Sequence, residues 1–216
     1  MDIFLDTFLL SFAALFPIVN PVGGAPLFLG LTQFCTEKER RSLALRVATN
    51  SFFLLLGSLL IGSHVLQFFG ISLPVVRIGG GLVVTAFGWK LLNSDERPDG
   101  DRDAQKNASP VPDSFYPLTM PLTVGPGSIS VAITLGANQS HGFRPLIVDA
   151  LAHATGALLV AVAIFVTLRY AEPILRRFGA TGTAVLLRMS AFILLCIGVQ
   201  IIWNGASTLA HAMGAS

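Results

Sequence analysis

Apolar residues run through this chain in six long segments, which are separated by short turns and one long polar stretch. Each segment is near the roughly 20 residues that an α-helix needs to cross about 30 Å of hydrocarbon. The pattern therefore predicts an all-α integral membrane fold with six transmembrane helices. The expected spans are about 3–31, 43–69, 73–92, 115–137, 146–170 and 184–213.

The polar stretch divides the chain into two halves of three spans each. Residues 93–114 contain prolines and many charged side chains but almost no apolar ones, which is typical of a solvated linker. We therefore expect a first three-helix unit at 1–92, a cytoplasmic linker at 93–114 and a second three-helix unit at 115–216.

Two of the six spans are interrupted by proline and glycine near their middle. Residues 16–26 read FPIVNPVGGAP and residues 120–128 read MPLTVGPGS, at corresponding positions of the two halves. Proline lacks a backbone N–H, so a helix unwinds there, which hydrocarbon tolerates only where the bared backbone faces protein or water. We expect the first and fourth helices to be discontinuous. Paired interruptions of this kind indicate the substrate site of a secondary transporter.

Basic residues are distributed unevenly between the two sides of the membrane that this pattern defines. Eleven of the 14 Lys and Arg residues fall in the loops after the first, third and fifth spans. By the positive-inside rule these loops face the cytoplasm and both termini face outside. The second half then enters the membrane upside down, as an inverted three-helix repeat. The sixteen-residue spacing of Arg77 and Asn93 recurs in Arg188 and Asn204, which supports the repeat.

The overall composition excludes several other classes of protein. Hydrophobic residues make up 53% of the chain, charged residues 12%, and the mean hydropathy is +0.71, which is too apolar for a soluble protein. The net charge of +2 gives no argument for binding nucleic acid. Two cysteines provide neither a disulfide framework nor a metal-ligand spacing, so we expect no metal and no cofactor.

The two interruptions carry the groups that a small zwitterion needs. The second half-helices begin near Gly23 and Gly127, where free backbone amides and the positive end of the helix dipole attract a carboxylate. The backbone carbonyl groups of the unwound residues next to these helix starts can bind an ammonium group or a coupling cation. The plainer alternative is that proline and glycine only kink these helices or let them pack closely. The candidate substrate-binding residues are Asn20, Pro21, Gly23, Gly24, Thr123, Gly125, Gly127 and Ser128.

Several ionisable or polar residues lie inside the spans and are candidates for coupling or gating. Asp149 and His153 are four residues apart, so they share one helix face and could relay protons. Arg77 could pair with Asp149, because charges inside a membrane need a partner or must reach the interface. A buried histidine bonded to a neighbouring carbonyl and arginines that snorkel are the alternatives. The candidates are Asn50, Arg77, Asp149, His153 and Arg188.

The two interrupted segments also carry a resemblance to a known family. Residues 16–32 read FPIVNPVGGAPLFLGLT and residues 115–133 read FYPLTMPLTVGPGSISVAI, and with them the whole chain resembles the MarC family of integral membrane proteins. The resemblance implies a prokaryotic cytoplasmic-membrane protein in a family whose members include transporters of small neutral amino acids such as glycine and alanine. Carried onto this chain, it points to Asn20, Pro21, Gly23, Pro121, Thr123, Gly125, Pro126 and Gly127.

The combined hypothesis is a secondary transporter that moves small neutral amino acids by alternating access, with proton coupling as a further expectation. Its expected partners are the amino acid and membrane lipid, with a homo-oligomer left open, and we do not expect an enzyme. One alternative is a membrane-embedded serine hydrolase-like enzyme that uses Ser128 as nucleophile and His153 as base. Another is a channel or transporter for a different small anion or zwitterion. Valine at Gly23 or Gly127 should abolish binding while the protein remains inserted.

Overall fold

A computed structural model describes residues 3–93, 112–137 and 143–214 of the chain. Every regular element in these ranges is helical, in agreement with the predicted fold class. The elements in chain order are α1 (Ile3–Val19), α2 (Pro21–Leu31), α3 (Glu37–Phe68), α4 (Leu73–Leu92), η2 (Ser114–Thr123), α5 (Pro126–Ala137), α6 (Phe143–Arg169) and α7 (Ala171–Gly214).

By length and composition, five stretches of the described chain can cross a membrane as single spans. They are Phe4–Leu31, Glu37–Phe68, Leu73–Leu92, Ile147–Arg169 and Thr181–His211. The pair formed by η2 and α5 makes a sixth if it counts as one span, and its two parts are bent by 69°. These stretches correspond to the six expected segments.

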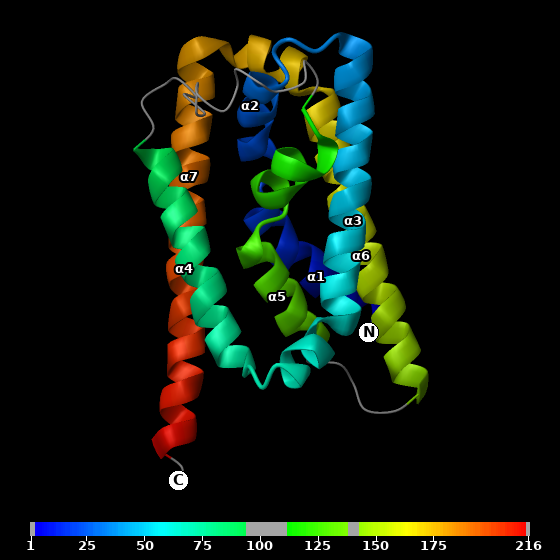
Figure 1. Cartoon of the computed structure of the whole chain (residues 1–216), viewed down its shortest axis with the longest axis vertical. Coiled ribbons are helices and arrows are strands. Elements are labelled where there is room, and N and C mark those ends of the chain that lie inside the picture. Colours follow the sequence, from blue (N-terminus) through cyan, green and yellow to red (C-terminus); the bar gives the residue numbers. More distant parts are fainter. Residues whose placement is uncertain (1–2, 94–111, 138–142, 215–216) are drawn as a thin grey trace.

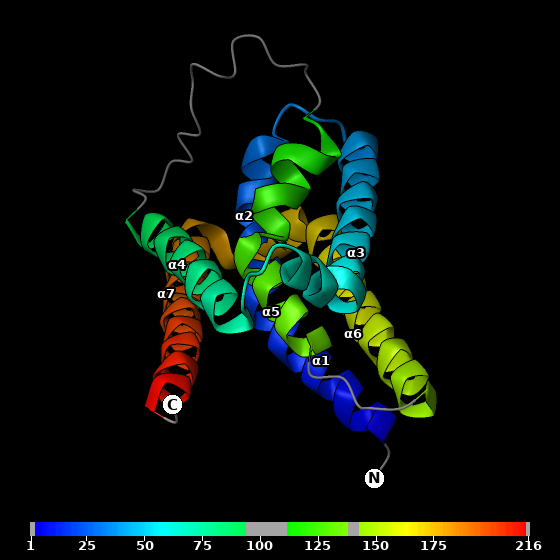
Figure 2. The ribbon, with the colours of Figure 1, turned by 60° about the horizontal axis from the view of Figure 1, so that its bottom comes forward.

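The helices are arranged as two outer pairs around a central group. Helix α3 packs against α6 and α4 packs against α7, while α1, α2, η2 and α5 lie between the two pairs (Figures 1 and 2). The described chain begins and ends at one end of the fold, which we call the terminal end. The connections from α2 to α3 and from α6 to α7 lie at the opposite end, which we call the loop end.

Glycines bring α4 and α7 into backbone contact. A Cβ atom added at Gly88 would lie 2.7 Å from the backbone nitrogen of Leu195, and one added at Gly205 would lie 2.8 Å from the carbonyl oxygen of Pro74. Contacts through small residues of this kind let membrane helices approach closely. The pair therefore depends on the absence of side chains at these positions.

Two helices begin earlier than the hydropathy pattern predicts. Helix α3 starts at Glu37 because Thr36 and Glu39 form a capping box, in which each side chain accepts a hydrogen bond from the other residue's backbone N–H. Helix α7 starts at Ala171, and Gly179, with a φ of 65°, joins its first part to the apolar span. Hydropathy identifies the part of a helix within hydrocarbon but not its polar extensions. Most of the predicted linker at 93–114 lies outside the described residues.

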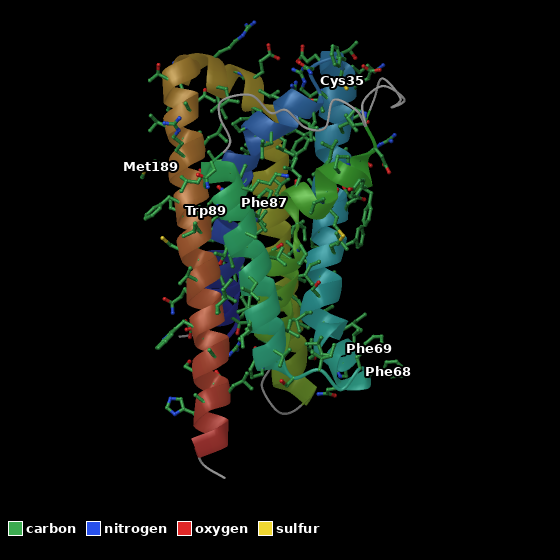
Figure 3. All side chains as sticks on the ribbon, turned by 60° about the vertical axis from the view of Figure 1, so that its left-hand side comes forward. Cys35, Phe68, Phe69, Phe87, Trp89 and Met189 are labelled. Carbon is green, nitrogen blue, oxygen red and sulfur yellow. The ribbon has the colours of Figure 1, made fainter. Side chains whose placement is uncertain are left out.

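The packed core lies mainly between α1, α3, η2 and α6, where Leu15, Leu55, Leu118 and Ile164 are fully buried. Large apolar side chains are also exposed on the outer faces, as expected for helices that meet lipid. Trp89 and Met189 point away from the bundle, whereas Phe87 points into it (Figure 3). Cys35 lies at the loop end, and Phe68 and Phe69 lie together at the opposite end.

Candidate functional site

A cavity of about 80 Å³ lies where α1 meets α2 and η2 meets α5. Both proline- and glycine-containing segments line it, and apolar side chains of α4 and α7, including Phe87 and Leu194, complete its wall. Pro21 is buried but does not line the cavity. The structure thus gathers the other seven candidate substrate-binding residues at one place: Asn20, Gly23, Gly24, Thr123, Gly125, Gly127 and Ser128.

Asn20 separates α1 from α2 and caps the second of these helices. Its backbone is left-handed, with φ 46° and ψ 60°, a conformation that asparagine adopts more readily than most residues. Its side-chain Oδ1 accepts a hydrogen bond from the backbone N–H of Gly23 at 3.1 Å. The oxygen is therefore used within the chain. The Nδ2 group remains a hydrogen-bond donor at the cavity wall.

The last carbonyl groups of α1 lack the partners that a continuous helix would supply. Pro21 has no N–H, and the N–H of Gly23 bonds to the Asn20 side chain instead of to the carbonyl of Val19. No hydrogen bond within the described chain reaches the carbonyl oxygens of Ile18 and Val19. Both residues line the cavity. This side of the cavity therefore offers oxygen acceptors, which suit a cation.

The start of α5 offers the opposite kind of group. The helix begins at Pro126, and the N–H groups of Gly127 and Ser128 have no hydrogen-bond partner among the described residues. The Ser128 hydroxyl donates to the carbonyl of Gly125 at 2.9 Å and so does not cap these amides. Free amides at a helix N-terminus, together with the helix dipole, favour an anion. The cavity thus presents acceptors at α1 and donors at α5.

The glycines around the cavity fall into two groups. A Cβ atom on Gly127 would overlap the side chain of Val84, and one on Gly23 would lie 2.8 Å from Cβ of Ser190. A Cβ atom on Gly24 would meet nothing within 4 Å. Valine at Gly23 or Gly127 would therefore disturb helix packing as well as the cavity. Gly24 is the position at which a side chain can enter the cavity without displacing a neighbour.

Asp149 and His153 lie together on α6, but they face α1 and not the cavity. Both are 3% exposed, and they lie beside two hydroxyl side chains of α1. Thr7 Oγ1 donates to Asp149 Oδ1 at 3.2 Å, and Ser11 Oγ lies 2.7 Å from His153 Nδ1. Thr7 and Ser11 are not among the residues predicted from the sequence, although their four-residue spacing places them on one helix face.

The geometry does not pair Ser128 with His153. The serine lies in the cavity with its hydroxyl bonded to Gly125, and the histidine ring is bonded to Ser11. A serine nucleophile needs a base within hydrogen-bond distance. The arrangement required for the serine hydrolase-like alternative is therefore not formed in this structure.

The remaining candidates for gating are spread over three places. Asn50 Nδ2 donates to Thr119 Oγ1 of η2 at 3.4 Å, and Arg77 Nε donates to Thr134 Oγ1 of α5 at 3.4 Å. Arg188 is exposed on the outer face of α7. No acidic side chain in the described part of the chain lies within ion-pair distance of Arg77, so the pair with Asp149 considered in the sequence analysis is not formed.

Two ion pairs at the loop end join the two halves of the chain and have no counterpart in the sequence analysis. Arg40 Nη1 lies 2.7 Å from Glu172 Oε2, and Arg169 Nη1 lies 3.3 Å from Glu37 Oε1. They connect the start of α3 with the end of α6 and the start of α7. Residues 132 positions apart form each pair, so no local pattern could reveal them.

Comparison with known proteins gives a consistent result over the whole chain. A family model described as "MarC family integral membrane protein" matches residues 5–210. The chain is 32% identical over 203 residues to the UPF0056 inner membrane protein MarC of Citrobacter koseri, covering 91% of this chain and 92% of the relative. It is 33% identical over 204 residues to the UPF0056 membrane protein of Methanocaldococcus jannaschii, covering 93% and 96%. No solved structure matches the chain significantly.

Proposed function

The chain belongs to the MarC family of integral membrane proteins, and on that premise we propose that it is a secondary transporter that carries small neutral amino acids by alternating access. The observation that carries this proposal is a cavity that both interrupted segments line together. It lies between the halves of the chain, where transporters built from repeats bind their substrates.

The polar groups of the cavity fit a zwitterion. The free N–H groups of Gly127 and Ser128 bind the carboxylate, and Asn20 Nδ2 donates a further hydrogen bond to it. The carbonyl oxygens of Ile18 and Val19 accept hydrogen bonds from the ammonium group.

The apolar wall sets the size and polarity of the substrate. Val83, Val84 and Phe87 offer no partner for a charged or strongly polar side chain. A buried polar group without a partner costs free energy, so the wall disfavours such substrates. Glycine and alanine are therefore the first substrates to test.

The contacts between helices support the proposed inverted repeat, with discontinuous first and fourth spans. If α1 with α2 corresponds to η2 with α5, α3 to α6, and α4 to α7, then the main contacts occur in corresponding pairs. The contact of α2 with α7 corresponds to that of α5 with α4, and the contact of α1 with α6 to that of η2 with α3. The bond from Asn50 to Thr119 and the bond between His153 and Ser11 join these last two pairs.

The proposed setting is the inner membrane of a prokaryote, with both termini outside and the loop end in the cytoplasm. Several relatives are named as inner membrane proteins, and the basic side chains gather in the loops after the first, third and fifth spans. Proton coupling would act through Asp149 and His153, which contact α1 but not the cavity. We propose no catalytic role for the protein.

Counterflow into proteoliposomes tests the proposal without knowledge of the driving ion. Vesicles that contain the purified protein are loaded with unlabelled glycine or alanine, and external labelled amino acid is added at low concentration. Transient accumulation of label, suppressed by external unlabelled alanine, is the expected result. Folded, monodisperse protein that shows no accumulation with either amino acid would remove small neutral amino acids as substrates.

A further inference from the structure

A second cavity, of about 500 Å³ and more open to the surface than the first, lies on the terminal side of the first. Its polar residues are Arg77 from α4, Thr134 from α5, and Asn204, Ser207 and Thr208 from α7. Within membrane-spanning helices, the N–H donors of Arg77 that have no partner in the described chain need water or a polar ligand, because hydrocarbon does not satisfy them. This cavity is therefore a candidate for a hydrated site.

The two cavities lie end to end along the same helices. On α4 the first is lined by residues from Val83 to Leu91 and the second by Arg77; on α7 the first is lined by Leu194 and the second by residues from Ile201 onward. Ile18 lines both cavities. Ile18 therefore marks the place where the two cavities adjoin.

Arg77 has the chemistry of an anion site. Its one hydrogen bond within the described chain is the long contact of Nε with Thr134 Oγ1 at 3.4 Å, so most of the guanidinium N–H donors are available to a ligand. A planar guanidinium binds a carboxylate through two parallel hydrogen bonds. Its charge is uncompensated by any described acidic residue, which favours an anionic group beside it.

The α7 wall of this cavity is rich in oxygen acceptors. The hydroxyl groups of Ser207 and Thr208 both donate to the carbonyl of Asn204, at 3.2 and 2.7 Å. Their oxygen atoms remain available as acceptors. The cavity thus presents a cation on α4 and acceptors on α7, which is again complementary to a zwitterion.

We propose that this cavity is a second binding site for a small carboxylate-bearing solute, in which Arg77 holds the carboxylate on the path between the terminal side of the membrane and the central cavity. The proposal rests on the proposed transport function, since it places a further site on the same path. An arginine that only snorkels to the interface would not give a site at which glycine protects a neighbouring thiol from modification.

Thiol modification tests the hydration and charge of the cavity without any transport measurement. The chain is prepared as V131C in a background with Cys35→Ser and Cys196→Ser, since Val131 lines this cavity. We expect a sulfonate-bearing methanethiosulfonate added on the terminal side to modify V131C several-fold faster than its trimethylammonium analogue. The preference should disappear with Arg77→Gln and return with Arg77→Lys. The matched control is V199C, a position exposed on α7, which should react with neither reagent because it faces lipid.

Each result of this experiment decides the proposal. Failure of V131C to react from the terminal side, or an anion preference that survives Arg77→Gln in monodisperse protein, would overturn it. Glycine should also protect V131C from the sulfonate reagent, and Arg77→Gln should abolish the protection. Normal counterflow of glycine by the unmodified chain without such protection would overturn the second site alone. Absence of counterflow together with Arg77-dependent protection would overturn the transport function and leave the carboxylate site standing.

Discussion

Asn20 caps the helix that follows it, because its Oδ1 accepts the N–H of Gly23 at 3.1 Å while its own backbone is left-handed. No corresponding side chain caps α5, where the amides of Gly127 and Ser128 have no partner in the described chain. The two interrupted spans therefore differ in the backbone groups that they leave free. The first caps the N–H of Gly23 and exposes carbonyls, whereas the second exposes amides.

Asn20→Asp should keep the helix cap and weaken substrate binding. The aspartate can still accept the N–H of Gly23, but it lacks the Nδ2 donor and adds a negative charge near the substrate carboxylate. Loss of one hydrogen bond to a charged group costs about 1.5–3 kcal/mol, so the KM for glycine in counterflow should rise by about ten- to a hundredfold. Thermal stability should change little, and an unchanged KM would place the carboxylate elsewhere.

Gly24→Val should block the central cavity without loosening the fold. A Cβ atom at this position meets nothing within 4 Å, and the residue lines the cavity. We expect counterflow to fall by more than about tenfold at an unchanged melting temperature. Gly127→Ala is the comparison, because its Cβ would meet Val84 and overpacking costs about 1–3 kcal/mol. Normal transport by Gly24→Val would show that the substrate does not use this cavity.

Ser128→Ala distinguishes a transporter from an embedded enzyme. The hydroxyl donates to the Gly125 carbonyl at 2.9 Å, so its removal should cost about 1 kcal/mol and change substrate affinity less than about tenfold. Concentration dependence of counterflow measures this change. Complete loss of turnover in a protein that still binds substrate would instead support a serine nucleophile.

His153→Gln tests whether the polar contact between α1 and α6 couples transport to protons. His153 Nδ1 lies 2.7 Å from Ser11 Oγ and outside both cavities, so the substitution should leave counterflow intact. Uptake driven by an imposed proton gradient should be lost if this contact carries the coupling. Ser11→Ala is the matched control for the loss of the hydrogen bond alone. Gradient-driven uptake that persists in His153→Gln would exclude a relay through this residue.

Cys35 should react slowly with thiol reagents and only from the loop end. Burial raises the pKa of its thiol, and the nearby Glu39 raises it further, while Arg40 opposes the shift. The thiolate is the reactive form, so below the raised pKa the rate should increase about tenfold per pH unit. An impermeant maleimide and a Cys196→Ser chain in vesicles of known orientation give both measurements. Modification from the outside of intact cells would reverse the proposed orientation.

Proline and glycine act on their own backbone, so their local effect can be predicted from the sequence. Pro21 has no N–H to offer α1, and Gly24 adds no side chain to the cavity, wherever the rest of the chain lies. Contacts between distant helices are different. Arg77 meets Thr134 and not Asp149, because the helix rotations that decide this contact follow from packing over many residues.

Helix boundaries illustrate the same limit. The capping box of Thr36 and Glu39 is visible in the sequence and could have placed the start of α3, whereas hydropathy alone begins the span later. The early part of α7 has only the weaker signal of Glu172 in its first turn. Its position follows from the turn after α6 and from the left-handed Gly179.

The backbone contact between α4 and α7 limits how the protein can change shape. A Cβ atom at Gly198 would lie 2.6 Å from the backbone nitrogen of Thr85, so the two helix backbones are in direct contact here. This pair contains one helix from each half of the chain, and we expect the two helices to move together as a rigid body. The conformational change of the transport cycle would then occur in the shorter central elements, which move relative to this pair. A disulfide that joins α4 to α7 should therefore not stop transport.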